Sequence, residues 1–410
     1  MHSSHGDGSG RDSYDELVQF GSGRAPGGRW LTRIALACLV LVAIITVAVR
    51  ATSHDAGHAA KTPHPPPRIS VSIVGHRMLG VTAGWELFAR GPDDLVRIRL
   101  AQGTVSVTYV PPLLTANPEV SFVIGQHEAV IRSTDLVPGY VVPDGAQARL
   151  LTWPLAGGGP LVPGPARAQA AWLTTGSPTS PALSLLTLGG HPIGPVIRFA
   201  PGGPQLPATA VSDGRGYVLV DTGSFTAYDA GPGWDRTVPG TVVAVGPTAW
   251  LVVACNPLYR HCHNVVVDSA NGTRRALPGP AAGYPYDFFS WPPTGVIAPD
   301  GGTAAVAETA SGQPTTSEIA SRGGIAGVLQ SGPNAVLTVH LINLRTGANR
   351  NLGIPVGADL SDQSMVWSPD SRWLFVAAAD GKLVAVNAST GRAELLPAPL
   401  PAVEQVAIRA

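Results

Sequence analysis

The sequence has few charged side chains and no excess of either sign. Of its 410 residues only 13% are Asp, Glu, Lys or Arg, and the 27 basic residues balance the 27 acidic ones. Binding to DNA or RNA usually needs a basic surface, so this composition argues against nucleic acid as a partner. Lysine occurs only at Lys61 and Lys382, whereas Arg, Ala, Gly and Pro are abundant, a usage typical of GC-rich bacteria.

The short motifs of common enzymes are also missing. The chain has no G-x-S-x-G, no phosphate-binding glycine loop and no H-E-x-x-H, since His127-Glu128 is followed by Ala-Val-Ile. We therefore predict no catalytic residue, no cofactor and no metal site. The alternative is a hydrolase or lyase whose residues converge from distant segments, because such a site leaves no local motif.

Helical patterns are scarce, whereas turn-forming residues are plentiful. The 49 Gly and 39 Pro are too many for a helical protein, and 44% hydrophobic residues are too many for a disordered chain. Many short strands joined by turns satisfy both numbers. We predict an all-β fold.

One long apolar run, Ile34 to Val49, lies near the amino terminus. Extended at both ends it is long enough to cross a bilayer, and Arg24, Arg29 and Arg33 before it place that end in the cytoplasm. The predicted organisation is a disordered cytoplasmic tail at 1–29, a single transmembrane helix at 30–50, a Pro-rich spacer at 51–68 and an extracytoplasmic domain at 69–410.

Other interpretations of the apolar run are a buried core helix and a cleaved signal peptide. The sequence after the run, Ala48-Val49-Arg50-Ala51, offers no clean A-x-A cleavage site, and the preceding tail is long for a signal peptide. Cys38 lacks a lipobox before it, since Ala35-Leu36-Ala37 departs from that pattern. These features favour a membrane anchor that stays attached.

The stretch from Met365 to Pro397 predicts three short strands joined by tight turns. Ser368-Pro369-Asp370-Ser371, Asp380-Gly381 and Thr390-Gly391 place turn-forming residues between β-branched or aromatic runs. Runs like its second strand, Trp373–Ala377, recur upstream at Trp85–Ala89, Glu128–Arg132, Trp172–Thr175, Tyr217–Asp221, Trp250–Ala254 and Ala304–Glu308.

Two further markers accompany these runs. Turns closing a third strand are predicted at Gln102-Gly103, Gly157-Gly158, Gly189-Gly190, Ala230-Gly231, Asn271-Gly272, Thr346-Gly347 and Thr390-Gly391. Endings of outer strands are predicted at Leu161, Ala276 and Leu395, where LVPGP, ALPGP and LLPAP begin. A spacing near 40 residues with four strands per unit predicts a β-propeller of about seven four-stranded blades, with six or eight blades and a pair of β-sandwiches as alternatives.

The segment Trp367 to Val376 resembles the S-P-D-G-x-x-[LI] core of the TolB and WD40-like propeller repeat families. Ser371 stands where those families usually have Gly, and Asp213-Gly214 and Ala298-Pro299-Asp300-Gly301 are partial copies. The resemblance implies a propeller, here in a bacterial membrane-anchored form, with protein-binding or scaffolding roles and no catalytic residue. To close such a ring, we expect Val403–Ile408 to return as the innermost strand of the first blade or Ile69–Val74 to pair at the same seam.

Cys255 and Cys262 are separated by six residues and lie between predicted strands of the fifth unit. Outside the cytoplasm such a pair across a loop is expected to form a disulfide. A metal site with His261 and His263 is the alternative, but adjacent residues of a strand point to opposite sides and the spacing matches no common zinc motif. The sequence favours the disulfide.

In a propeller, the loops between second and third strands share a face with the segments that join blades. Three long connections should therefore lie on one face: the Cys255–Cys262 loop, the joining segment Tyr284–Phe289 and the insertion Thr309–Asn334. Tyr and Arg are frequent at interfaces, so the predicted contact residues are Tyr259, Arg260, His261, Tyr284, Tyr286 and Asp287. Alternatively, Phe288, Phe289 and Trp291 form a strand and the tyrosines pack beneath the loop.

These observations predict a single-pass membrane protein whose extracytoplasmic propeller binds a protein or another component of the bacterial cell envelope. The propeller enzyme described above is the competing hypothesis. A third hypothesis places the partner at the cytoplasmic tail, where Tyr14–Phe20 is the one short apolar segment.

Overall fold

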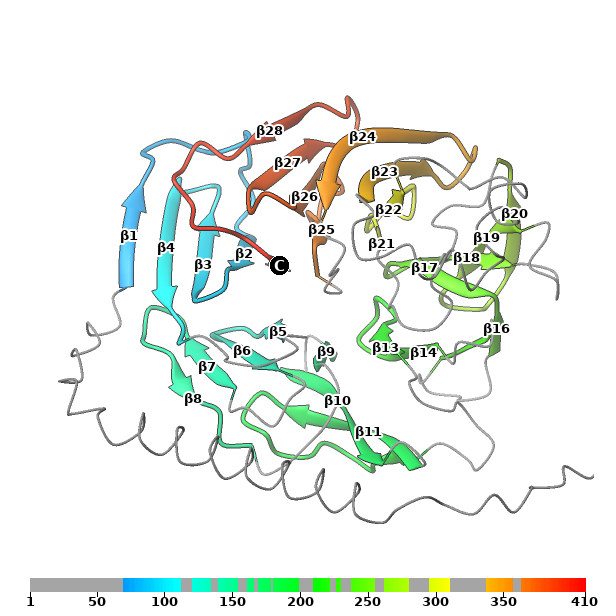
Figure 1. The fold of residues 1–410 in the computed structure, drawn as a ribbon, viewed down its shortest axis with the longest axis horizontal. Coiled ribbons are helices and arrows are strands. Elements are labelled where there is room, and N and C mark those ends of the chain that lie inside the picture. Colours follow the sequence, from blue (N-terminus) through cyan, green and yellow to red (C-terminus); the bar gives the residue numbers. More distant parts are fainter. Residues whose placement is uncertain are drawn as a thin grey trace, which may run out of the picture. The chain divides into compact units, whose positions relative to one another are not determined.

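The computed structural model describes residues 69–111, 120–133, 139–153, 161–165, 169–177, 180–198, 209–221, 226–229, 237–254, 262–279, 295–309, 337–356 and 363–410. All described residues belong to one compact unit, Pro66–Ala410. They form β-strands and no helix (Figure 1), so this part of the chain is all-β, as predicted. No described segment could cross a membrane as a helix. The apolar run at 34–49 lies outside the described residues.

The strands follow one another as up-and-down meanders. The first sheet has the order β1-β4-β3-β2-β29, with β1 (Ile69–Ile73), β2 (Glu86–Arg90), β3 (Asp94–Arg99), β4 (Thr104–Tyr109) and β29 (Gln405–Arg409). The second has the order β5-β6-β7-β8, with β5 (Val120–Ile124), β6 (Glu128–Ser133), β7 (Tyr140–Pro143) and β8 (Arg149–Leu150).

The third and fourth sheets repeat this four-stranded pattern. One has the order β12-β11-β10-β9, with β9 (Leu161–Pro163), β10 (Ala170–Ser177), β11 (Ser180–Thr187) and β12 (Ile197–Arg198). The other has the order β13-β14-β15-β16, with β13 (Thr209–Ser212), β14 (Val218–Asp221), β15 (Thr226–Asp229) and β16 (Thr237–Pro239).

The eight-stranded sheet consists of two such meanders joined by one parallel pair. Its first half holds β17 (Thr241–Val245), β18 (Ala249–Ala254), β19 (His263–Asp268) and β20 (Arg274–Leu277), and its second half β21 (Gly295–Ile297), β22 (Thr303–Thr309), β23 (Leu337–Asn343) and β24 (Asn349–Val356). β17 and β21 pair in parallel, with Ala244 opposite Gly295. The last sheet holds β25 (Met365–Trp367), β26 (Trp373–Ala377), β27 (Leu383–Asn387) and β28 (Ala393–Leu395).

The described strands thus make seven successive groups of four, with β29 as the first strand of the first group and β1 as a fifth strand outside it. First strands of neighbouring groups contact each other: β29 with β5, β5 with β9, β9 with β13, β17 with β21, β21 with β25, and β25 with β29. The fourth and fifth groups meet through β15 and β17. The predicted pairing of the carboxy-terminal segment with the first unit is confirmed, since β29 pairs with β2 along its whole length.

All seven predicted second strands are second strands of their groups. They lie within or overlap β2, β6, β10, β14, β18, β22 and β26, and each of these strands has strands paired on both sides. Central strands bury both faces, and this explains why their sequences are short continuous apolar runs. The buried side chains of β18 and β26, from Trp250 to Val253 and from Leu374 to Ala377, illustrate this.

Two of the predicted markers were wrong. The sequence LVPGP at Leu161 does not end an outer strand: Leu161–Pro163 is β9, the first strand of the third group, and Leu161 and Val162 are buried. The turn that closes β7 contains Gly145, not Gly157-Gly158. A short apolar run followed by Pro-Gly has the same local sequence at either edge of a sheet, so only its partner strands distinguish the two positions.

The three S-P-D-G-like segments occupy the same turn, between the first and second strands of the fourth, sixth and seventh groups. In each, the Asp Oδ1 accepts a hydrogen bond from the backbone N–H two residues later. The donors are the N–H groups of Arg215, Gly302 and Arg372, and the acceptors are Asp213, Asp300 and Asp370 respectively. The next residue has a positive φ, 79° at Gly214, 71° at Gly301 and 60° at Ser371. The position after the Asp is therefore a left-handed one, which Ser371 adopts although it carries a Cβ.

We expect Asp370→Ala to lower the free energy of unfolding by about 1 kcal/mol, because the turn loses a side-chain acceptor. Asp370 Oδ1 accepts hydrogen bonds from the Ser368 hydroxyl at 2.6 Å and the Arg372 N–H at 3.2 Å. Asp370→Asn keeps an oxygen at the same place and is expected to lose less than half as much. Urea unfolding of the three proteins measures the difference, and equal losses for Ala and Asn would contradict this role of the oxygen.

Tryptophans stabilise the contacts between neighbouring groups. The indole N–H of Trp250 donates to the Asp213 carbonyl at 2.9 Å, and that of Trp367 donates to the Val296 carbonyl at 3.0 Å. In the first group, Trp85 packs edge-on against Phe375 of the seventh, with ring centroids 5.9 Å apart. Each ring buries a large apolar area between two groups, and Trp250 and Trp367 also satisfy their polar atom there. The groups are therefore packed against one another as one unit.

Candidate functional site

The six predicted contact residues, Tyr259, Arg260, His261, Tyr284, Tyr286 and Asp287, lie outside the described residues. The strands that flank them are described. Ala254 at the end of β18 pairs with His263 at the start of β19, and Asn264 pairs with Leu277 at the end of β20. The segments 255–262 and 278–294 therefore begin at the same end of the eight-stranded sheet.

The predicted insertion leaves from this end as well. Thr309, the last residue of β22, pairs with Leu337, the first of β23, and Leu337 also pairs with Val356 at the end of β24. β21 runs parallel to β17, so both halves of the sheet have the same orientation. All three long connections are thus anchored at one end of this sheet, and we call it the loop end. The opposite end carries short turns such as those at Gly272 and Gly347.

Of the two cysteines predicted to form a disulfide, only Cys262 is described. It lies at the loop end, partly buried against a core cluster that includes Leu251 and Leu277. Cys255 lies outside the described residues, so the pairing of the two remains a prediction. Within the described part of the chain, no group of His, Cys, Asp and Glu side chains has the arrangement of a metal site.

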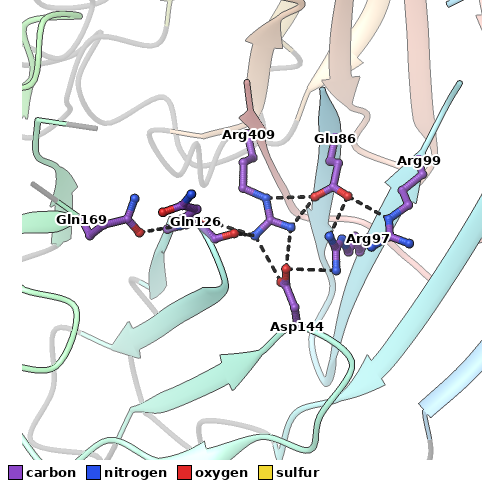
Figure 2. Close-up of polar contacts among 8 residues, drawn as sticks. Glu86, Arg97, Arg99, Gln126, Asp144, Gln169 and Arg409 are labelled. Carbon is purple, nitrogen blue, oxygen red and sulfur yellow. Dashed lines mark hydrogen bonds and ion pairs between the residues drawn. The ribbon is translucent and has the colours of Figure 1, made fainter. Parts of the chain in front are cut away.

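A charged cluster lies on the first sheet, at the end where β29 finishes and β2 begins (Figure 2). Glu86 accepts hydrogen bonds from Arg97 Nη2 at 2.6 Å, Arg99 Nε at 2.8 Å and Arg409 Nε at 2.9 Å. Asp144, from the turn after β7, accepts from Arg409 Nη2 at 2.8 Å and pairs with Arg97 Nη1 at 3.1 Å. Two carboxylates and three guanidinium groups from two sheets therefore meet in one network.

Arg409 makes most of the polar contacts between the two sheets within this cluster. Its Nη1 also donates to the backbone carbonyls of Gly125 and Gln126, at 3.1 and 2.8 Å, and its guanidinium lies 4.7 Å from the centre of the Phe88 ring. The Gln126 N–H in turn donates to Gln169 Oε1 of the third group at 2.6 Å. These bonds use the planar, multiple-donor geometry of arginine, which lysine cannot reproduce.

The electrostatics of Glu86 follow from these partners. Burial alone would raise the pKa of Glu86, but the hydrogen bonds from Arg97, Arg409 and Arg99 and the charge of Arg409 outweigh it and lower the pKa from 4.5 to about 2. A carboxylate with so low a pKa is a poor proton acceptor at neutral pH. The cluster is therefore suited to holding β29 in place and not to acid–base catalysis.

A second polar cluster holds the other end of β29. Arg90 donates to Gln405 Oε1 and, at 2.5 Å, to Glu404 Oε2. The Gln405 amide donates to the Val120 carbonyl at 2.6 Å, and that of Gln363 donates to the Phe122 carbonyl at 2.7 Å. Arg90 and Gln405 are 8% and 1% exposed, so these bonds satisfy polar groups that have left water. They connect the seventh, first and second groups.

A small hollow lies beside this cluster, between the first and second groups. It is lined by Arg90, Gly91, Pro92, Asp94, Val110, Pro111 and Ile131, and its free volume of about 10 Å³ has room for about one water molecule. Pockets for small-molecule ligands usually exceed about 300 Å³, so the hollow is small for such a ligand. Burial, followed by the neighbouring charge of Asp93, raises the pKa of Asp94. Asp93 is exposed, whereas Asp94 is partly buried.

Sequence reasoning missed both clusters. Glu86, Asp144 and Arg409 are far apart in the sequence, and none belongs to a motif. One signal was available: pairing the carboxy-terminal segment antiparallel to Trp85–Ala89 brings Arg409 to the start of that strand. The structure pairs Glu86 with Arg409 directly.

No family model matches this chain, and no curated protein matches it. Among solved structures it is similar to TolB from Acinetobacter baumannii, with 14% identity over 79% of this chain and 66% of that one and a TM-score of 0.42. A mutant of the Synechocystis apocarotenoid oxygenase has 12% identity over 84% of this chain and 96% of that one, with a TM-score of 0.47.

The tricorn protease has 8% identity over 77% of this chain, with a TM-score of 0.36. This chain spans just under two thirds of the TolB chain and 38% of the tricorn protease chain. At these identities and TM-scores, no function and no site residue transfers to this chain.

Proposed function

We propose that residues 69–410 form a closed propeller of seven four-stranded blades. The contacts between neighbouring groups support this proposal, because they lead from β29 through β5 and β9 to β13, continue between β15 and β17, and return through β21 and β25 to β29. The pairing of β29 with β2 supports it too, since it joins the two ends of the domain in one blade. Such a ring is rigid because each blade is packed between two others.

We further propose that the protein is a membrane-tethered, extracytoplasmic binding or scaffold module of the bacterial cell envelope. Its partner would be a protein or another envelope component. One observation carries the binding role: three long connections are anchored at one end of the eight-stranded sheet. A rigid sheet that presents several long loops on one side is a common design for recognition.

The contact surface would be the predicted set Tyr259, Arg260, His261, Tyr284, Tyr286 and Asp287. Tyrosine supplies a large rigid area with a polar tip, and arginine supplies several donors, so both contribute strongly to interfaces. A disulfide between Cys255 and Cys262 would restrain the loop that carries Tyr259 and thereby reduce the entropy lost on binding. The anchor at 30–50 would hold this surface close to the envelope.

A capture experiment tests the binding surface. The full-length tagged chain is crosslinked in cells, purified, and compared with Tyr284→Ala combined with Tyr286→Ala. We expect the unaltered chain to retain an envelope component that the double variant loses by at least about tenfold, as expected when two anchor residues are removed. The matched control, Arg345→Ala combined with Arg392→Ala, alters two exposed residues in turns at the opposite end of the sheets.

The control variant should retain the partner fully. Equal retention by the tyrosine variant would remove these residues from the contact surface. Loss with both variants would show that the effect is not specific to the loop end and would contradict the proposed surface. Similar melting temperatures for all three proteins are required, because a misfolded domain would also lose its partner.

A further inference from the structure

β1 is an additional strand on a group that is complete without it. The first group already has the four strands β29, β2, β3 and β4, and β1 pairs with the outer side of β4. The side chains of Ser70, Val71, Ser72 and Ile73 are exposed, with Val71 at 63% and Ile73 at 75%. These four side chains therefore bury almost nothing against their own domain.

The outer edges of the other groups are protected against pairing with another chain. Short strands, charges, prolines and bulges are the usual means of protection. Four of these edge strands are short: β8 and β12 have two residues each, and β16 and β28 have three. β20 carries two charges, Arg274 and Arg275. β24 contains Pro355, and its pairing with β23 is interrupted by a bulge. β1 differs from these edges, because its five residues include no charge, no proline and no bulge.

The hydrogen bonding of β1 shows which backbone groups remain available. The Val74 N–H donates to the Gly103 carbonyl at 2.8 Å, in continuation of the β1–β4 register. Backbone groups of successive strand residues point alternately to opposite sides. Ser70 and Ser72 therefore direct their N–H and C=O groups toward β4, and Ile69, Val71 and Ile73 direct theirs to the outer edge, which no described strand covers.

We propose that this edge pairs with the same edge of a second copy of the chain, antiparallel and centred on Val71. The strand sequence Ile-Ser-Val-Ser-Ile reads the same in both directions. In this register Val71 lies opposite Val71 of the second copy, and Ile69 lies opposite Ile73 of the second copy. The outward backbone groups of all three positions then exchange both N–H···O=C bonds of a hydrogen-bonded pair.

The sequence fits a second copy better than an unrelated strand. A twofold axis requires that one surface complements itself, and the palindrome places Ser70 opposite Ser72 and β-branched residues opposite β-branched residues. No charged residue of the strand faces a like charge, which would otherwise oppose self-pairing. A single five-residue strand pair is small for an interface, so we expect a weak dimer.

Disulfide trapping tests the register. The full-length chain is purified in detergent with Cys38→Ser, and Val71→Cys, Ile73→Cys or Ile69→Cys is added. Hydrogen-bonded antiparallel pairs have Cα atoms about 5.5 Å apart, within the range of a disulfide, whereas the two copies of residue 73 would lie about 14 Å apart. Under mild oxidation we expect Val71→Cys to form a covalent dimer at least about tenfold faster than Ile73→Cys alone.

A mixture of Ile69→Cys and Ile73→Cys chains should form a mixed dimer that neither forms alone. Val71→Lys should reduce dimer formation, measured by light scattering over a range of concentrations, and leave the melting temperature unchanged because the side chain is exposed. The proposal is overturned if the unaltered chain is monomeric throughout that range, or if Ile73→Cys crosslinks as fast as Val71→Cys. Neither outcome depends on the partner proposed for the loop end.

Discussion

A chain truncated after Ala402 is expected to lose most of its stability and to accumulate as insoluble protein. The deletion removes β29, which pairs with β2 and contacts β5 and β25. It also removes Val403 and Val406, which are 2% and 1% exposed in the core cluster that contains Leu87 and Phe375. The lost apolar burial and the loss of both polar clusters should together lower the free energy of unfolding by more than about 5 kcal/mol, which is comparable with the whole stability of an ordinary domain.

Deletion of Ile69–Ile73 provides a matched control. It removes a five-residue strand from the opposite edge of the same sheet, but the described side chains of that strand are exposed. We expect this variant to stay soluble and to melt within about 3 °C of the unaltered chain, since little apolar area is lost. The soluble yield and the melting temperature, followed by circular dichroism, are measured for both deletion variants. If the two deletions lower stability equally, β29 has no special role in holding the domain together.

The strands at the centre of each group could be predicted from the sequence because local composition specifies them. Runs such as Trp250–Ala254 and Trp373–Ala377 are apolar on both faces and follow a turn. This pattern can be recognised in the local sequence without knowing which strands lie beside it. The return of the carboxy-terminal segment could be predicted for a different reason. An open edge at the first group would be exposed to aggregation, and Val403–Ile408 was the apolar segment available to cover it.

Edges were harder to predict than centres. Leu161–Pro163 was expected to end an outer strand, yet it pairs with Ala171–Leu173 as the first strand of its group. Its position is set by the Leu161 N–H, which donates to Ser121 Oγ of the second group at 2.8 Å, and by burial between two groups. Both are contacts over long sequence distances, and no local pattern records them.

The charged cluster at the end of β29 could not be found by a search for motifs. Its members come from β2, β3, β29 and the turn after β7 (Figure 2). They meet only because β29, near the carboxy terminus, pairs with β2, near the start of the domain. Catalytic motifs are recognisable because the chemistry fixes residue types at short spacing. An ion-pair network needs only charges at the right places in the fold, so its sequence signature is spread over more than three hundred residues, as the separation of 323 residues between Glu86 and Arg409 shows.

We expect Glu86→Gln to lower the free energy of unfolding by about 1–2 kcal/mol at pH 7, after allowance for solvent screening of a partly exposed group. Arg97 and Arg409 would then share Asp144 as the remaining carboxylate of this network, and Arg99 would lose its ion pair with Glu86. Asp380→Asn is the control: Asp380 also has a lowered pKa, because of a hydrogen bond from Lys382, but it is fully solvated in a turn. That variant should unfold at the same denaturant concentration as the unaltered chain.

The pH dependence distinguishes a charge effect from a packing effect at Glu86. Because the pKa of Glu86 is about 2 in the folded chain and near 4.5 when unfolded, its contribution is complete above pH 4.5 and is lost as the pH falls through 2. The stability difference between the unaltered chain and Glu86→Gln should therefore shrink steadily between pH 4.5 and pH 2, where a protonated Glu86 resembles glutamine. Other carboxylates titrate in both proteins and cancel from the difference. A difference that stays constant down to pH 2 would mean that Glu86 acts through its shape and hydrogen bonds alone, and the ion pairs with Arg97, Arg99 and Arg409 would then contribute no net stability.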